Sequence, residues 1–263
     1  MDHLPDENRR YKDVDYWDER YQVEQSFDWF GDFSKFKHLL ENLINKDDSI
    51  LVLGCGNSSM SGEMYDAGYR RITNIDYSSV CVDAMAARHA HCPGMTWRQM
   101  DARQLDVPDA SFDIVLEKAT LDAMLVEEKD PWKVSPQTAG LIHQVLKEVR
   151  RALRPRGRFL SLTFAQPHFR KPLYARREYR WSVAQHTYGD GFHYFLYAMT
   201  AGEELSPEDA AMETRRLEEA EAPPPQMSSG ASIGFFQWMQ GAEQNVNPWP
   251  KQGCTPSTAL YFK

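Results

Sequence analysis

One short apolar run followed by a glycine-bearing turn constrains the fold of this chain more than any other feature. The run is Ser49–Leu53, and Gly54-Cys55-Gly56-Asn57 follows it at once. A run of this length predicts a buried strand, and the glycines let the backbone turn sharply and approach a ligand closely. A helix closing at Gly68 and a strand ending at Asp76 come next. This order of strand, helix and strand is typical of a parallel sheet.

The same alternation continues along the chain. Ser78 or Ser79 can cap a helix that runs to about Ala90, and Ser135 with Pro136 predicts a longer helix that ends before Pro155. Further strands are expected at 96–100, 112–116, 158–164, 181–187 and 192–200, and further helices at 33–45 and 171–180. A short glycine-containing connection between the last two strands favours a hairpin. We therefore predict an α/β fold: a Rossmann-like, doubly wound, mostly parallel seven-stranded sheet with a reversed C-terminal hairpin strand.

Composition divides the chain into three parts. Residues 1–48 are rich in aromatic side chains, and we expect an aromatic lid and a helix packed on the core. Residues 49–202 form the predicted core. Residues 203–263 are acidic and then rich in Pro, Gly and Ser, which predicts one exposed helix and a largely disordered tail. The aromatic residues of that tail leave a short partner-binding motif open as an alternative.

Several classes of protein are disfavoured. No apolar stretch approaches the ~20 residues that cross a bilayer, and no secretory signal is visible, so we expect a cytoplasmic protein without a membrane partner. The four cysteines lack C-x-x-C spacing and are expected to be reduced thiols. His89 and His91 have no acidic or cysteine partner set, so no metal site is expected.

Charge gives little indication of a nucleic acid partner. The net charge is -8, although residues 147–180 carry a local excess of Lys and Arg. Solvated helix faces explain this excess better than a docking surface, which stays the alternative. We expect a monomer.

The candidate site lies where the predicted strands end, because open α/β sheets bind ligands there. Asp76 follows Gly56 by twenty residues, at the end of the second strand, where a carboxylate can accept hydrogen bonds from ribose hydroxyls. Asp101 closes the third strand and suits an adenine amino group. A helix N-cap is the alternative for Asp76, and a turn or cap role is the alternative for Asp101. Ser59 replaces the third glycine of a dinucleotide fingerprint, so adenosine without phosphates fits better, and a nicotinamide dehydrogenase is disfavoured.

These segments resemble the class I S-adenosylmethionine-dependent methyltransferases over residues 10–200. A closer resemblance is to the methyltransferase-like proteins that methylate lysines of translation elongation factor 1 alpha. Two departures are Val52, where many members of the class carry an acid, and Ala119, where the closer group usually has Gly. The segments that carry the resemblance are 16–21, 28–30, 50–58, 75–78, 100–101 and 110–123.

The resemblance implies S-adenosylmethionine as the cofactor and S-adenosylhomocysteine as its product. An aromatic lid would attract the sulfonium and exclude water, although simple hydrophobic anchoring explains the same aromatic residues equally well. The residues implied in cofactor binding are Trp17, Tyr21 and Trp29 as a cover, Gly54, Cys55 and Gly56 in the turn, Asp76 and Tyr77 at the ribose, Asp101 and Ala102 at the adenine, and Glu117 and Lys118 at the edge.

The resemblance further implies a protein-lysine methyltransferase with elongation factor 1 alpha as its protein substrate, by in-line methyl transfer to a deprotonated lysine amine. Glu117 and Asp122 could bind the lysine ammonium, and Lys118 completes the candidate catalytic set. A surface salt bridge and a helix cap are the alternatives for these two carboxylates. A small-molecule methyltransferase and a non-catalytic cofactor-binding adaptor stay open as alternative functions.

Overall fold

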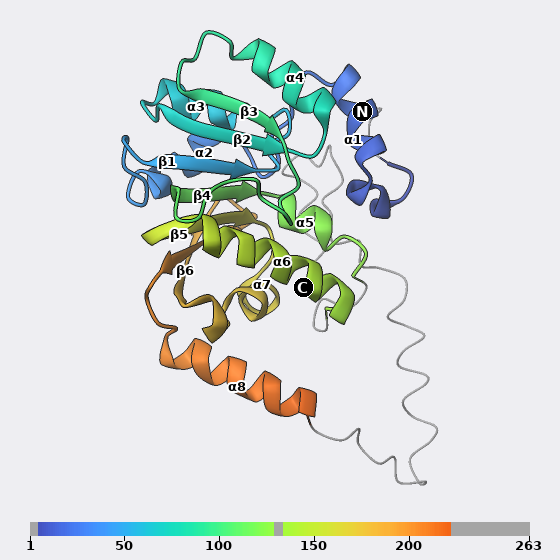
Figure 1. Ribbon diagram of the computed structural model, residues 1–263. Helices are drawn as coiled ribbons and strands as arrows, with labels where there is room; N and C mark the ends of the chain where they lie inside the picture. Colours follow the sequence, from blue (N-terminus) through green and yellow to red (C-terminus); the bar gives the residue numbers. More distant parts are fainter. Residues whose placement is uncertain (1–4, 129–133, 222–263) are drawn as a thin grey trace. The chain divides into compact units, whose positions relative to one another are not determined.

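A computed structural model describes residues 5–128 and 134–221 of the chain (Figure 1). The described residues up to Glu213 make up one compact unit, and the described residues from Thr214 onward belong to a second. The N-terminal aromatic segment and the predicted core therefore belong to the same unit. The tail from residue 222, for which disorder was predicted, lies outside the described residues. Among the residues that are described, no helix has the length and apolar character needed to cross a membrane.

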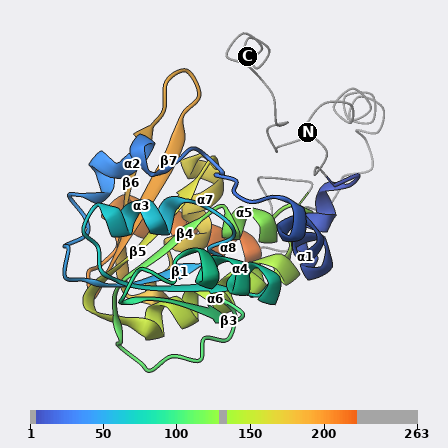
Figure 2. The same cartoon turned by 90° about the horizontal axis from the view of Figure 1, so that it is seen from above.

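The described part contains a seven-stranded sheet with the strand order β3-β2-β1-β4-β5-β7-β6. Neighbouring strands from β3 to β5 run parallel, and β7 is antiparallel to both β5 and β6. The predicted sheet and its reversed hairpin strand are thereby confirmed, and Figure 2 shows the β6–β7 connection extending beyond the other strands. The strands are β1 (Ser49–Leu53), β2 (Arg71–Asp76), β3 (Met95–Gln99), β4 (Phe112–Lys118), β5 (Leu153–Thr163), β6 (Trp181–Tyr188) and β7 (Tyr194–Ala201).

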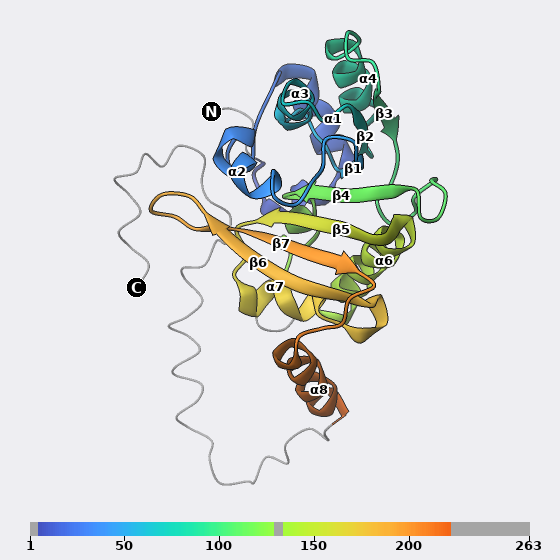
Figure 3. The same cartoon turned by 90° about the vertical axis from the view of Figure 1, so that its left-hand side faces the viewer.

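Helices cover both faces of the sheet (Figure 3). Each face has its own apolar core: Leu51 and Val115 pack toward α6, whereas Ile50 and Val52 pack toward α2 and α3. Strand β1 is consequently buried on both faces, as the uninterrupted apolar run indicated. The helices are η1 (Asn8–Lys12), α1 (Val14–Val23), α2 (Phe33–Leu40), α3 (Met60–Asp66), α4 (Ser79–Arg88), α5 (Thr120–Met124), α6 (Pro136–Ala152), α7 (Pro167–Tyr174), η2 (Arg177–Tyr179) and α8 (Pro207–Glu221).

Two predicted helices have wrong boundaries. Helix α2 ends at Leu40 rather than Asn45, because the next residues form a turn in which Ile44 stays in the same apolar core. Burial, rather than a continuing helix, causes the apolar spacing there. The helix predicted at 171–180 begins instead at Pro167, which occupies its first turn, and it ends at Tyr174.

Candidate active site

The parallel strands bring three predicted site segments to one edge of the sheet. Leu53 at the end of β1 lies opposite Ile75 of β2 on one side and Glu117 of β4 on the other. The turn that starts at Gly54 therefore lies between Asp76 and the end of β4. The N–H of Gly56 donates to Oδ2 of Asp76 over 3.0 Å.

The glycines of this turn are required by its conformation and by its neighbours. Gly54 and Gly56 have φ values of 57° and 52°, in the left-handed region that favours glycine. A Cβ at Gly54 would lie 2.4 Å from Oγ1 of Thr120, and one at Gly56 would lie 3.0 Å from the Tyr21 hydroxyl oxygen. The turn is therefore packed between α5 on one side and the N-terminal segment on the other.

Asp76 is a buried carboxylate that, among the described residues, has no Lys or Arg partner. Its side chain accepts from the N–H groups of Gly56 and Ser78, each over 3.0 Å, and the residue is 3% exposed. The bond to Ser78 resembles the capping alternative, but the true N-cap of α4 is Ser78, whose hydroxyl accepts from Cys81 N–H. Burial raises the pKa of Asp76 to about 6. Asp76 thus offers hydrogen-bond acceptors and has no compensating cation among the described residues.

The predicted lid is built on α1 and the segment after it. Tyr21 reaches the glycine turn and stacks on Trp17, with ring centroids 5.5 Å apart. The indole N–H of Trp17 donates to the Tyr11 carbonyl over 2.8 Å, and the buried Arg20 guanidinium lies over the rings of Trp17 and Trp29. These contacts anchor the segment. Tyr21 is the lid residue that they bring next to Gly56.

Tyr77 and Ala102 directly follow Asp76 and Asp101, the two carboxylates that are predicted to bind the nucleoside. Burial first, and then the Asp76 carboxylate, raises the pKa of Tyr77, so its hydroxyl stays neutral. Asp101 pairs with Arg103, whose Nε and Nη2 donate over 3.0 and 2.6 Å, and it also accepts from the Arg103 N–H. Burial acts to raise the pKa of Asp101, but these bonds prevail and lower it. Asp101 therefore makes the turn contact that was the alternative to binding an adenine amino group.

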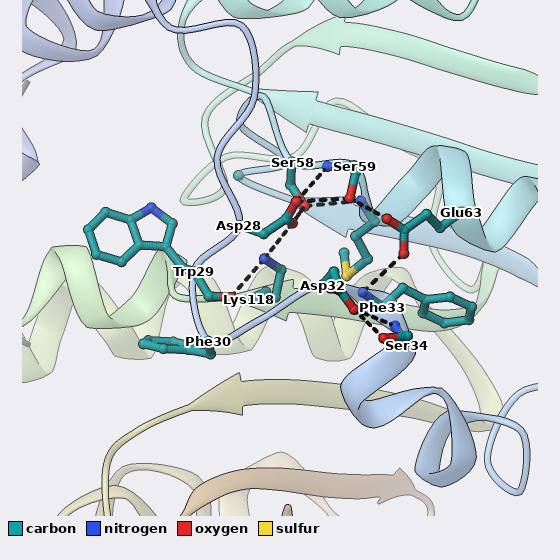
Figure 4. Close-up of polar contacts among 12 residues, drawn as sticks. Asp28, Trp29, Phe30, Asp32, Phe33, Ser34, Ser58, Ser59, Glu63 and Lys118 are labelled. Atoms are coloured by element: carbon teal, nitrogen blue, oxygen red, sulfur yellow. Dashed lines mark hydrogen bonds and ion pairs between the residues drawn. The ribbon is translucent and has the colours of Figure 1, made fainter. Parts of the chain in front are cut away.

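Lys118 ties the lid to the end of β4 (Figure 4). Its Nζ lies 3.1 Å from Oδ1 of Asp28 and donates to the Trp29 carbonyl over 2.9 Å. Asp28 also accepts from the hydroxyls of Ser58 and Ser59 and from the Ser59 N–H. Burial lowers the pKa of Lys118, and the Asp28 carboxylate opposes this shift. We name this group, Asp28, Ser58, Ser59 and Lys118, the lid clasp.

Glu117 is fully buried in β4, opposite Leu53, the last residue before the glycine turn. One carboxylate oxygen accepts from the N–H groups of Thr120 and Leu121, and the other accepts from the Ser161 hydroxyl. Burial, followed by the charge of Asp122, raises the pKa of Glu117 to about 7. In this arrangement Glu117 holds the turn from β4 into α5.

Asp122 pairs with a buried arginine. Its Oδ1 accepts from Nη2 of Arg170 and from the Thr163 hydroxyl, the latter over 2.6 Å. Oδ2 of Asp122 and two guanidinium nitrogens of Arg170 are buried without a hydrogen-bond partner among the described residues. Burial raises the pKa of Asp122, although Arg170 opposes the shift.

Sequence reasoning missed the partners of these carboxylates. Arg170 lies on α7, 48 positions from Asp122. In the sequence nothing distinguishes it from the other basic residues nearby. The 28–30 segment carried part of the family resemblance, which could have pointed to Asp28. No periodicity signals either contact, because both join distant segments.

Comparison with known proteins also indicates a methyltransferase. A methyltransferase domain model matches residues 51–161. EEF1A lysine methyltransferase 4 of Bos taurus is 49% identical over 225 residues, which cover 84% of this chain and 88% of that protein. The human eEF1A lysine and N-terminal methyltransferase is 38% identical over 174 residues, which cover 65% of this chain and 24% of that protein.

The fold is also found in a solved protein of Pyrococcus horikoshii OT3, with a TM-score of 0.50 and 18% identity over 73% of this chain and 95% of the other. The resemblance inferred from the motifs is confirmed by the sequence relatives. This chain belongs to the methyltransferase family that includes EEF1A lysine methyltransferase 4.

Proposed function

We propose that this chain is an S-adenosylmethionine-dependent protein-lysine methyltransferase whose substrate is elongation factor 1 alpha. Relatives from Bos taurus and Mus musculus, 49% and 48% identical, are named EEF1A lysine methyltransferase 4. Similarity of this extent, along 84% of the chain, supports the same acceptor. We also propose that the protein acts as a monomer in the cytoplasm, where translation takes place.

The buried carboxylate of Asp76 carries the cofactor proposal. It lies beside a turn in which Gly54 leaves no room for a Cβ, and it has acceptor oxygens but no cationic partner among the described residues. A ribose offers two hydroxyl donors, which such a carboxylate can accept, and each charged hydrogen bond contributes about 1.5 to 3 kcal/mol. S-adenosylmethionine would supply the methyl group on a positively charged sulfur. We propose Gly54, Cys55, Gly56 and Tyr77 beside Asp76, and Asp101 with Ala102 toward the adenine.

The lid residues would exclude water from this site. Tyr21 already lies against Gly56, and Trp17 stacks on Tyr21. Trp29 is fixed through its carbonyl by Lys118. An aromatic cover attracts a cation by about 0.5 to 2 kcal/mol and removes competing water. Lys118 is a positioning residue in this proposal, because its Nζ is occupied by Asp28 and Trp29.

The acceptor lysine must lose a proton before it can attack, because its ordinary pKa is ~10.4. Oδ2 of Asp122 is buried and has no hydrogen-bond partner among the described residues, so an amine or a water molecule that entered the site could donate to it. Glu117, with its pKa raised to about 7, can hold a proton near neutral pH. We propose that Asp122 orients the acceptor amine and that Glu117 assists the deprotonation of this amine.

The test is an assay with radiolabelled S-adenosylmethionine, the full chain and purified elongation factor 1 alpha, resolved by protein size. Label in the elongation factor that disappears with Asp76→Ala is expected. Asp83→Ala, at an exposed aspartate on α4, is the matched control and should keep full activity. Label confined to small molecules would favour the small-molecule methyltransferase, and cofactor binding without any label would favour the adaptor. Either result would overturn the proposal.

A further inference from the structure

Two cysteines and the site carboxylate meet in the interior. The Sγ atoms of Cys55 and Cys81 and a carboxylate oxygen of Asp76 all lie within 4.8 Å of one another. All three residues are buried, with exposed fractions of 7%, 1% and 3%. They come from three different elements: the glycine turn, the first turn of α4 and the end of β2. No sequence motif predicts this group, because the two cysteines are 26 positions apart.

The group lacks a cation. Asp76 makes no ion pair within the described residues; its side chain accepts from the backbone N–H groups of Gly56 and Ser78. Cys55 likewise lies beside Asp76 and Cys81. Two sulfur atoms and a carboxylate oxygen this close together, with no cationic side chain paired to them among the described residues, are a donor set that a thiophilic metal cation can use.

We propose that Cys55, Cys81 and Asp76 form a binding site for a thiophilic divalent cation such as Zn²⁺, and that the cation and the methyl-donor cofactor exclude each other. The first part rests on geometry alone. The second part rests on the proposed function, since it requires Asp76 to bind the cofactor ribose.

The spacing is compatible with coordination after a small adjustment. With Zn–S bonds of about 2.3 Å and tetrahedral angles, two ligand sulfurs lie roughly 3.8 Å apart. The upper limit of 4.8 Å among the three ligand atoms therefore requires a shift of at most about 1 Å. Three protein ligands leave a fourth position for water, which is the arrangement of an open zinc site.

The chemistry balances without an oxidant. Each thiol releases one proton to solvent, two metal–sulfur bonds and one metal–oxygen bond form, and nothing changes oxidation state. A disulfide from the same pair would need a two-electron oxidant, which neither the structure nor the proposed reaction supplies. Coordination instead drives deprotonation by binding the thiolate product.

Mutual exclusion follows from the shared carboxylate. The N–H of Gly56 donates to the Asp76 carboxylate and fixes its position. The two carboxylate oxygens of Asp76 would therefore have to face either the ribose hydroxyls or the metal. Drawing Cys55 toward a cation would also pull on the glycine turn, whose conformation is fixed by packing against Thr120 and Tyr21.

The first experiment titrates the full chain with Cd²⁺, a probe whose thiolate complexes absorb in the ultraviolet. The chain carries Cys92→Ser and Cys254→Ser, so that only Cys55 and Cys81 remain. We expect one Cd²⁺ per chain with the absorption of two thiolate bonds, displaced by Zn²⁺. Cys81→Ser in this background should weaken Cd²⁺ binding at least about tenfold and halve the absorption. Cys81→Ala serves as a second variant if the serine form does not fold.

The second experiment measures cofactor binding by calorimetry with and without Zn²⁺. The apparent Kd of S-adenosylmethionine should rise in proportion to Zn²⁺ and return after addition of a chelator. Cys81→Ser should bind the cofactor normally in metal-free buffer and lose this sensitivity, whereas Cys92→Ser should keep it.

Unchanged Cd²⁺ absorption in both Cys81 variants, or simultaneous binding of Zn²⁺ and cofactor, would overturn the inference. The Cd²⁺ titration needs no cofactor. A chain that binds Cd²⁺ through Cys81 but does not bind S-adenosylmethionine would therefore refute the proposed function while leaving the metal site in place.

Discussion

Lys118 Nζ lies 3.1 Å from Oδ1 of Asp28, and this ion pair joins two segments that are 90 positions apart. The side chains are 4% and 17% exposed, so both charges are largely removed from water. Buried charges of this kind are tolerated when they are paired and hydrogen-bonded, as Asp28 is by Ser58 and Ser59. The lid clasp therefore fixes the N-terminal segment next to the end of β4, beside the candidate site.

The lid clasp should stabilise both the fold and the bound cofactor. Lys118→Met removes one charge and leaves Asp28 buried, which should lower the free energy of unfolding by about 3 kcal/mol. Because the lid is then held only by the remaining contacts, cofactor affinity should fall as well. Urea denaturation and calorimetry measure the two effects. The matched control is Lys37→Met, since Lys37 pairs with Glu41 at an exposed position and should contribute less than about 1 kcal/mol. Equal losses in the two variants would contradict the role of the clasp.

The sheet could be predicted from the sequence because its signals are local. The Ser49–Leu53 run, the glycines after it and the Ser135-Pro136 pair each depend on neighbouring residues, and the structure has β1 and α6 at these positions. Register between strands then brings Gly54, Asp76 and Glu117 to one edge, which is a consequence of parallel order rather than of any single motif.

The environment of the site could not be predicted in the same way. Whether Glu117 faces solvent or the interior depends on Ser161 and Thr120, which approach it from other segments. The pairing of Asp122 with Arg170 and the meeting of Cys55 with Cys81 likewise depend on tertiary packing. Spacing in the sequence contains no information about these distances, so the chemistry of the carboxylates had to come from the structure.

The second prediction concerns Ala119, where the related group usually has Gly. Its φ is 68°, so a residue with a Cβ occupies the left-handed region at the start of α5. This conformation costs about 1 to 2 kcal/mol for a residue other than glycine. Ala119→Gly should therefore stabilise the fold by about 1 kcal/mol, after the greater flexibility of glycine in the unfolded chain is counted. Thermal denaturation should show a higher Tm.

Ala87→Gly is the control for this substitution. Ala87 is exposed within α4, where glycine should instead destabilise by about 1 kcal/mol. The same sign of effect at both positions would show that strain at Ala119 does not contribute.

The third prediction concerns the pH dependence of cofactor affinity. Ribose hydroxyls donate to an ionised carboxylate, and the pKa of Asp76 is raised to about 6 by burial. Affinity for S-adenosylmethionine should therefore be constant above about pH 7 and fall as Asp76 becomes protonated below about pH 6. Asp76→Asn should bind about 10 to 100 times more weakly at pH 7.5 and lose most of this dependence. Calorimetry across this range tests both points. Asp83→Asn should behave like the unchanged chain, and a pH profile that Asp76→Asn leaves intact would remove Asp76 from the ribose role.

The last prediction concerns stability and pH. Burial raises the pKa of Asp76 from 3.8 to about 6 and that of Glu117 from 4.5 to about 7. Because the folded chain then binds these protons more tightly than the unfolded chain, both groups stabilise the fold most below about pH 4, and this contribution is lost as the pH rises to about 7. The free energy of unfolding should thus increase by roughly 2 to 4 kcal/mol between about pH 7.5 and pH 5.

Two other kinds of group act differently in this range. The carboxyls with lowered pKa, such as Asp28 and Asp113, lose their contribution only at more acidic pH. His89, whose pKa burial lowers, opposes the trend slightly, because charging it costs free energy.

Urea denaturation of Glu117→Gln should show a more stable protein at pH 7.5 and a flatter dependence of stability on pH, since the neutral amide removes the buried charge. Glu128→Gln is the matched control: burial acts to raise the pKa of Glu128, but the hydrogen bonds from Ser135 and Thr138 and the charge of Lys12 together lower it. Its profile should keep the slope of the unchanged chain. A free energy of unfolding that rises from pH 5 to pH 7.5 in the unchanged chain would contradict the buried, proton-binding state of Glu117.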